Sequence, residues 1–172
     1  MDTKVRIADY FESAVKAWRI LKTSKISAVN EGLDDDHIIK LCEYLSGRNQ
    51  IKSLNLRRNK IGDRGAMAIS NYINLHDKTL TSLELERNQI SDVGGEALLL
   101  AMQNNMRMEV CRIGYGNDIR SKITRKLKTE IEANKQIKST VVPEYKKNGN
   151  RLNEIKESDR GPSFVRCALK SC

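Results

Sequence analysis

The sequence predicts an α/β fold built from stacked strand–helix repeats. Two segments, 51–73 and 80–102, match at eight positions that are each 29 residues apart. The matched pairs are Ile51/Leu80, Leu54/Leu83, Leu56/Leu85, Asn59/Asn88, Ile61/Ile90, Gly65/Gly94, Ile69/Leu98 and Ile73/Met102. Within each unit the L-x-x-L-x-L half alternates as a strand does, and the second half spaces apolar residues as one stripe of a helix. Since one such unit cannot bury its apolar faces alone, its neighbours must stack on it.

Two more divergent units flank the matching pair. Downstream, the pattern continues at a further 29 residues in Asn117, Ile119, Ile123, Leu127 and Ile131. The strand positions before them fit at 28, so 114–116 holds one extra residue. Upstream, a spacing of 28 aligns Ile26, Ala28, Leu33, Leu41 and Leu45, with Glu31 in place of the repeat asparagine.

The repeat asparagine and glycine have structural roles at the bend from strand to helix. The asparagine can hydrogen-bond backbone groups there. Gly65 and Gly94 are expected to give the helix room to pack closely on the bend.

The pattern L-x-x-L-x-L-x-x-N-x-I, followed by a helix at a period of 28–29 residues, resembles the leucine-rich repeat family and its ribonuclease-inhibitor-like class. The resemblance covers 26–131 and is strongest over 51–102. It implies an α/β solenoid with parallel strands on a concave face, helices on a convex face and protein recognition on the concave face. With about four repeats, the solenoid is expected to be a short, shallow arc.

The two ends of the array need covers, because a terminal repeat otherwise exposes apolar surface. Residues 4–21 form an amphipathic helical pattern, so 1–25 is predicted to be a capping helix; docking of its stripe into a partner's groove is the alternative. The apolar stripe consists of Ala8, Phe11, Val15, Trp18 and Leu21.

The carboxyl end is predicted to be a helix followed by a tail. The last repeat helix is expected over 119–138, with Asn134 at its end, which makes 26–138 the repeat domain. Residues 139–172 are expected to form a flexible basic tail, because the segment after Pro143 is polar and nearly devoid of aliphatic residues. A short apolar stretch from Phe164 to Leu169 either docks or binds in trans.

The residues between the buried strand leucines are expected to face outward on the inner sheet. Neighbouring parallel strands lie about 4.8 Å apart, so Arg57 should lie beside Glu86, and Glu84 beside Arg112. These contacts are either surface ion pairs worth about 0–1 kcal/mol each or a mixed-charge patch that recognises a partner protein. Arg58, Arg87 and Tyr115 are expected to form a further row at the edge. The candidate partner-binding residues are therefore Asn55, Arg57, Arg58, Glu84, Glu86, Arg87, Arg112 and Tyr115.

Charge is uneven along a chain whose formal net charge is +9. Residues 120–138 hold 7 basic and 2 acidic residues. Their basic cluster, which could meet an anionic partner, consists of Arg120, Lys122, Arg125, Lys126 and Lys128. Nucleic acid is disfavoured as that partner, since no base-stacking aromatic residues interleave with the cluster. Asp34 to Asp36 precede a helix, where carboxylates favour its positive end, and they lack the spacing of a calcium-binding loop.

The remaining motifs argue against several functional classes. No phosphate-binding loop, nucleophile elbow or metalloprotease spacing is present, so no enzyme, cofactor or metal is expected. Cys42 and Cys111 are predicted to be buried thiols. No apolar run reaches the length of a membrane span and no secretory signal is visible, which favours a cytoplasmic protein, with the nucleus as the alternative.

Three functions remain open from the sequence. The first is a non-catalytic interaction module, adaptor or scaffold, expected to be a monomer that binds one partner protein on the concave face. The second is cytoskeletal actin binding, because the short array, last helix and basic tail, with Gly-Tyr at 114–115, are similar to the repeat domain of tropomodulins. The third is binding of nucleic acid or another anionic surface through the 120–138 helix.

Overall fold

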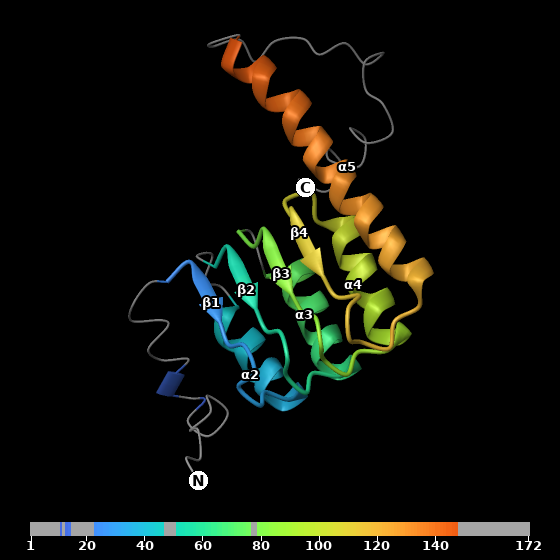
Figure 1. The fold of residues 1–172 in the computed structure, drawn as a ribbon. Coiled ribbons are helices and arrows are strands. Elements are labelled where there is room, and N and C mark those ends of the chain that lie inside the picture. Colours follow the sequence, from blue (N-terminus) through green and yellow to red (C-terminus); the bar gives the residue numbers. More distant parts are fainter. Residues whose placement is uncertain (1–10, 12, 15–22, 47–50, 77–78, 148–172) are drawn as a thin grey trace. The chain divides into compact units, whose positions relative to one another are not determined.

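The protein is seen in a computed structural model that describes residues 11, 13–14, 23–46, 51–76 and 79–147. Over residues 23–147, as far as they are described, four strands alternate with four helices, and these strands are parallel in the order β1-β2-β3-β4. The elements are β1 (Lys25–Ser27), α2 (Asp35–Leu45), β2 (Ser53–Asn55), α3 (Asp63–Leu75), β3 (Ser82–Glu84), α4 (Asp92–Asn104), β4 (Val110–Arg112) and α5 (Ser121–Lys147). The strands form one layer and α2, α3 and α4 cover one of its faces (Figure 1).

Residues that are one repeat apart in the sequence pair with each other in the sheet. Leu54 pairs with Ile26 on one side and with Leu83 on the other. All three side chains are at most 1% exposed, so the strand leucines form a continuous core beneath the helices. Burying a leucine or isoleucine side chain of this kind stabilises the fold by about 1.5–3 kcal/mol.

A ladder of asparagines joins consecutive repeats at the bend after each strand. Asn88 accepts a hydrogen bond from the Ile61 backbone N–H at 3.1 Å and donates to the carbonyls of Leu56 at 3.0 Å and Leu85 at 2.9 Å. Asn59 and Asn117 make equivalent bonds in their own repeats. The predicted role of the repeat asparagine is therefore confirmed, and each one satisfies backbone groups of two repeats at once.

A second ladder, of aspartates, caps each helix from the preceding repeat. The Asp35 carboxylate accepts from the Gly62 and Gly65 N–H groups, and Asp63 accepts in the same way from Ser91 and Gly94. A Cβ on Gly94 would lie 2.6 Å from Asp63 Oδ1, so only glycine lets this carboxylate approach the helix start. At the start of α2 the acidic residues lie where the sequence predicts: Asp34 is the N-cap and accepts from the His37 N–H, and Asp35 and Asp36 lie in the first turn.

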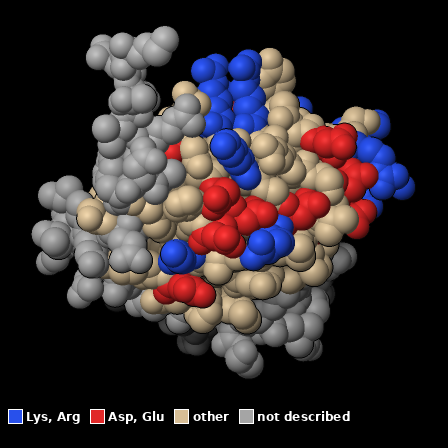
Figure 2. All heavy atoms as spheres, turned by 90° about the horizontal axis from the view of Figure 1, so that it is seen from below, with Lys and Arg blue, Asp and Glu red and all other residues tan. Residues whose placement is uncertain are grey.

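The aspartate ladder lies on the face where strands lead into helices. Figure 2 shows that face from below, with acidic side chains gathered across its middle and basic side chains around them. Burial alone would raise the pKa of Asp63, but hydrogen bonds from Ser91 and Gly94 outweigh it and hold that pKa below its ordinary value. Asp63 therefore acts as an ionised helix cap, in keeping with the positive end of a helix dipole.

Most of the predicted capping helix lies outside the described residues. Phe11, Ser13 and Ala14 are helical, and Phe11 and Ala14 are buried. The Phe11 ring meets the His37 ring edge to face, with 5.1 Å between centroids. Phe11 therefore packs on α2 of the first repeat, and the cap itself stays a prediction.

The predicted end of the last helix at Asn134 is wrong. Residues Met1–Lys135 form one compact unit, yet α5 runs on through Pro143 to Lys147 in a second unit, Gln136–Cys172. Asn134 does not end its helix because its buried amide is used elsewhere, donating to the Asn105 carbonyl at 3.0 Å. Residues 139–147, assigned to the tail from the sequence, are thus helical, and the rest of that segment lies outside the described residues.

Within the described chain, no helix has the length and apolar character needed to span a membrane.

Candidate protein-binding surface

Four charged side chains from three adjacent strand segments form a connected cluster over two successive levels of the sheet. We call Arg57, Glu84, Glu86 and Arg112 the strand-face ladder. Arg57 Nε lies 2.9 Å from Glu86 Oε2, in ionic contact although not aligned for a hydrogen bond. Glu84 Oε2 lies 3.8 Å from Arg57 and 3.8 Å from Arg112. The predicted neighbours, Arg57 beside Glu86 and Glu84 beside Arg112, are confirmed.

The strand-face ladder compensates its own charge. Two arginines face two glutamates, and the glutamates are the less exposed members, at 19% each. Pairs of this kind, partly open to water, contribute about 0–1 kcal/mol each to stability. Their main effect is to place two arginines and two glutamates next to one another, so that a partner would meet an alternating pattern of charge.

The insertion in the fourth repeat shifts the register by one residue from the predicted row. The Arg87 backbone N–H donates to the Tyr115 backbone carbonyl, just as the Arg58 backbone N–H donates to the Glu86 backbone carbonyl. Tyr115 therefore occupies the position of Glu86, not of Arg87, and the extra residue lies between Arg112 and Tyr115. The predicted row of Arg58, Arg87 and Tyr115 is therefore wrong, because Gly116 and not Tyr115 takes the position equivalent to Arg87.

The backbone places Arg58 and Arg87 in an unfavourable conformation. Both have positive φ angles, 57° and 56°, and the equivalent positions in the outer repeats hold Asn30 and Gly116. Asparagine and glycine adopt this left-handed region readily, whereas an arginine there costs about 1 kcal/mol or more. Folding alone thus does not favour arginine at these two positions.

Tyr115 and Arg87 form an exposed pair beside the strand-face ladder. Arg87 donates to the Tyr115 hydroxyl at 3.0 Å, and the guanidinium carbon lies 4.9 Å from the centre of the Tyr115 ring. Tyr115 remains 61% exposed. Tyrosine and arginine in such positions are frequent anchors of protein interfaces. Asn55 contributes less, because its carboxamide oxygen already accepts from the Arg57 N–H at 3.3 Å.

The predicted basic cluster on α5 divides into paired and unpaired cations. Arg120 donates to Asp92, and Arg125 donates to the Ser121 carbonyl at 3.2 Å. Backbone and side-chain hydrogen bonds from Arg120 lower the pKa of Asp92, so this ion pair is maintained at neutral pH. Lys122, Lys126 and Lys128 form no ion pair with any residue that the structure describes.

Of the two cysteines in the described part of the chain, Cys42 is buried as predicted, whereas Cys111 is only partly buried. Burial raises the pKa of both the Cys42 and the Cys111 thiol to about 12. A thiol with such a pKa is almost entirely protonated at neutral pH and is a poor nucleophile.

Together, the parallel sheet, the outer helices and the asparagine ladder define a leucine-rich repeat solenoid. A family model described as Leucine Rich repeat matches residues 49–70 and 76–99. The chain therefore carries leucine-rich repeats, as the sequence predicts, and repeats of this family generally serve as non-catalytic, protein-binding modules.

Among solved structures, the chain is similar to one titled "Leiomodin-1 Actin-Binding Site 2 (ABS2)". The TM-score is 0.64, and the likeness covers 83% of this chain and 98% of that chain at 17% identity. At this identity the likeness shows a shared fold. A comparison with curated proteins finds no match.

Proposed function

We propose that this chain is a non-catalytic interaction module, an adaptor, that binds a partner protein through the strand-bearing, concave face of its repeats. The observation that carries the proposal is the strand-face ladder together with the exposed Arg87–Tyr115 pair beside it. The ladder supplies a fixed pattern of alternating charge, and the pair supplies an aromatic and cationic anchor.

Backbone strain supports the same surface. Arg58 and Arg87 occupy left-handed positions where asparagine or glycine would be more favourable. Strain of this kind clusters at functional sites, where a side chain is useful for something other than stability. Both arginines are exposed, so their side chains are available to a partner.

Comparing the affinity of two double variants for the same partner protein tests this proposal. Arg112→Glu with Tyr115→Ala changes the exposed end of the strand face. Lys40→Glu with Leu75→Ala makes matched changes at exposed positions of α2 and α3. A protein captured by the wild type from nuclease-treated cell extract is purified, and its affinity for each variant is measured by calorimetry.

The strand-face variant should bind at least about tenfold more weakly, while the control should stay within about twofold. Equal binding by the wild type and the strand-face variant would refute recognition by this face. Circular dichroism melting curves of both variants check that each remains folded.

Actin is the second candidate partner, and the similarity to the leiomodin-1 fragment is the observation in its favour. The chain matches nearly all of that fragment, so the two share the whole repeat unit rather than one motif. Titration of labelled monomeric actin, with filament elongation as a second readout, tests this candidate. Absence of binding at about 50 μM actin would refute it, because specific interfaces of standard size bind at micromolar concentrations or tighter.

We further propose that the protein acts as a monomer in the cytoplasm, or alternatively in the nucleus. Light scattering should then give a mass near 19.6 kDa. Microscopy of the tagged protein tests its location.

A further inference from the structure

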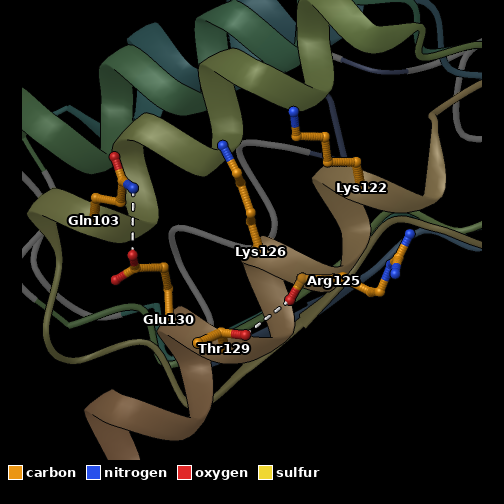
Figure 3. Close-up of a pocket in the computed structure, with 6 residues that line it drawn as sticks. All are labelled: Gln103, Lys122, Arg125, Lys126, Thr129 and Glu130. Atoms are coloured by element: carbon orange, nitrogen blue, oxygen red, sulfur yellow. Dashed lines mark hydrogen bonds between the residues drawn. The ribbon is translucent and has the colours of Figure 1, made fainter.

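A hollow with basic walls separates α4 from α5, on the helical side of the repeats. Its volume is about 430 Å³, and it is lined by Gln103, Lys122, Arg125, Lys126, Thr129 and Glu130. We call it the basic groove. Figure 3 shows Lys122 and Lys126 extending from α5 toward α4, whereas Arg125 turns the other way.

Two lysines extend their charge from α5 toward α4, whereas the charged Arg125 is turned away from α4. Arg125 is held by Ser121, and Glu130 accepts a hydrogen bond from Gln103 at 3.3 Å. Lys122 and Lys126 have no acidic partner among the residues that the structure describes. Two ammonium groups thus lie close together without compensation, in contrast to the strand-face ladder, and an anionic ligand would supply the missing charge.

The spacing of these lysines matches acidic side chains on a peptide. They are four residues apart on α5, which corresponds to a rise of about 6 Å along the helix. Carboxylates four residues apart on a partner helix have the same rise, and carboxylates two residues apart on an extended segment are about 6.6 Å apart. One peptide segment can therefore present two carboxylates to Lys122 and Lys126 at once.

The α4 bank of the groove adds apolar surface. Val93 and Leu100 are 58% and 56% exposed, and a separation of seven residues puts both on one stripe of α4. Gln103, which lines the groove, follows Leu100 by three residues and so lies next to it on the same side of the helix. Val93 and Leu100 do not line the groove itself, so only a partner that also extends over the outer surface of α4 would meet these aliphatic side chains.

This combination favours an acidic peptide over a nucleic acid. The residues that line the groove include no aromatic ring on which a base could stack. Glu130 in the wall and the exposed Glu96, four residues before Leu100 on α4, would repel a continuous row of phosphates. We propose that the basic groove binds an acidic amphipathic segment of a partner protein, an inference that rests on the proposed protein-binding function and adds a second contact surface to it.

Direct peptide binding tests the groove. The probe is a fluorescein-labelled synthetic peptide of about 16 residues, with two glutamates one helical turn apart and a leucine on the same side. A scrambled peptide of the same composition is the ligand control. Anisotropy is measured on the full chain, on Lys122→Glu with Lys126→Glu, and on Lys40→Glu with Lys52→Glu, which changes the net charge equally at exposed positions elsewhere.

The wild type should prefer the probe to the scrambled peptide, and the groove variant should bind it at least about tenfold more weakly. The charge-matched control should stay within about twofold, and Leu100→Ser should weaken binding severalfold. The milder Lys122→Gln with Lys126→Gln should also lose affinity, which keeps the test valid if charge reversal perturbs α5.

Three results would overturn the inference. They are equal binding of probe and scrambled peptide, equal loss in both charge-reversal variants, and tighter binding of a single-stranded oligonucleotide that the groove variant abolishes. The strand-face variant, Arg112→Glu with Tyr115→Ala, should leave probe binding unchanged. Failure of the groove and failure of the proposed strand-face function are therefore told apart.

Discussion

Replacing Asn88 with alanine should lower the free energy of unfolding by about 3–5 kcal/mol. The side chain is only 8% exposed, and its hydrogen bonds reach backbone groups of two repeats. The Ile61 N–H loses its acceptor inside the protein, which costs about 1–3 kcal/mol. The carbonyls of Leu56 and Leu85 each lose one of two donors, which costs about 1 kcal/mol apiece.

The cost at the two carbonyls is smaller because each also accepts a hydrogen bond from a neighbouring asparagine of the asparagine ladder. Leu56 O still accepts from Asn59 Nδ2 at 2.9 Å, and Leu85 O still accepts from Asn117 Nδ2 at 2.9 Å. The Ile61 N–H has no such substitute in the described structure. Loss of this one N–H partner should therefore dominate the effect, out of a total stability of about 5–15 kcal/mol for a domain of this size.

Urea denaturation followed by circular dichroism measures the change. With a slope of about 2 kcal/mol per molar urea, the midpoint should fall by about 1.5–2.5 M. Asn74→Ala, at an exposed position late in α3, should change stability by less than about 0.5 kcal/mol. Hydrogen exchange should accelerate most at the Ile61 amide. A loss below about 1 kcal/mol for Asn88→Ala would show that backbone relaxation or water replaces the asparagine, and would refute the reasoning.

Four other changes test individual features of the fold. Gly94→Ala should destabilise by about 1–3 kcal/mol in the same urea assay, because its Cβ would lie 2.6 Å from the Asp63 carboxylate and 2.9 Å from a side chain of α3. The pKa of Asp63 is held below its ordinary 3.8 in the folded protein. The ionised carboxylate therefore stabilises the fold above pH about 4, and this stabilisation is lost as the pH falls through the folded-state pKa. Asp63→Asn should flatten the dependence of the urea midpoint on pH in that acidic window. Arg58→Asn should raise the urea midpoint, by about 0.5–1 kcal/mol of stability, since it relieves a left-handed arginine, and an unchanged or lower midpoint would count against strain there. With the two C-terminal cysteines replaced by serine, Cys42 and Cys111 should react with a thiol reagent at pH 8 only after denaturation, because burial raises their pKa to about 12; fast native-state labelling would contradict this.

The repeat spacing in the sequence is enough to predict the register of the sheet. An offset of 29 pairs Leu54 with Leu83, and an offset of 28 pairs Ile26 with Leu54. Since side chains alternate along a strand, the same offset of 29 is sufficient to place Arg57 beside Glu86. The geometry of the strand-face ladder is therefore a direct consequence of the repeat.

Three features could not be predicted from the repeat spacing. The position of the extra residue near Tyr115 depends on which backbone groups pair, and a spacing of 28 or 29 fits either side of the insertion. Asp35, Asp63 and Asp92 do recur at the repeat spacing, but the sequence does not say whether a carboxylate caps its own helix or the next one. Asn134 has the character of a helix-ending residue, and the sequence does not show that its amide is buried against Asn105 within a helix that continues to Lys147.

Charge compensation assigns different physical roles to the two candidate surfaces. The strand-face ladder has as many arginines as glutamates, so it exerts little long-range attraction, and its contribution to binding would lie in the pattern that a partner must match. Lys122 and Lys126 are uncompensated, so the basic groove would attract acidic segments over a distance set by the Debye length, about 8 Å at physiological ionic strength. Raising salt from about 50 to 300 mM should therefore weaken peptide binding at the groove strongly. At the strand face the ladder itself should add little salt dependence, and any larger loss there should come from the exposed Arg58 and Arg87, which have no glutamate partner among the described residues. If Arg58→Asn with Arg87→Asn did not reduce that loss, the ladder arginines would have to exchange their glutamates for partner carboxylates on binding.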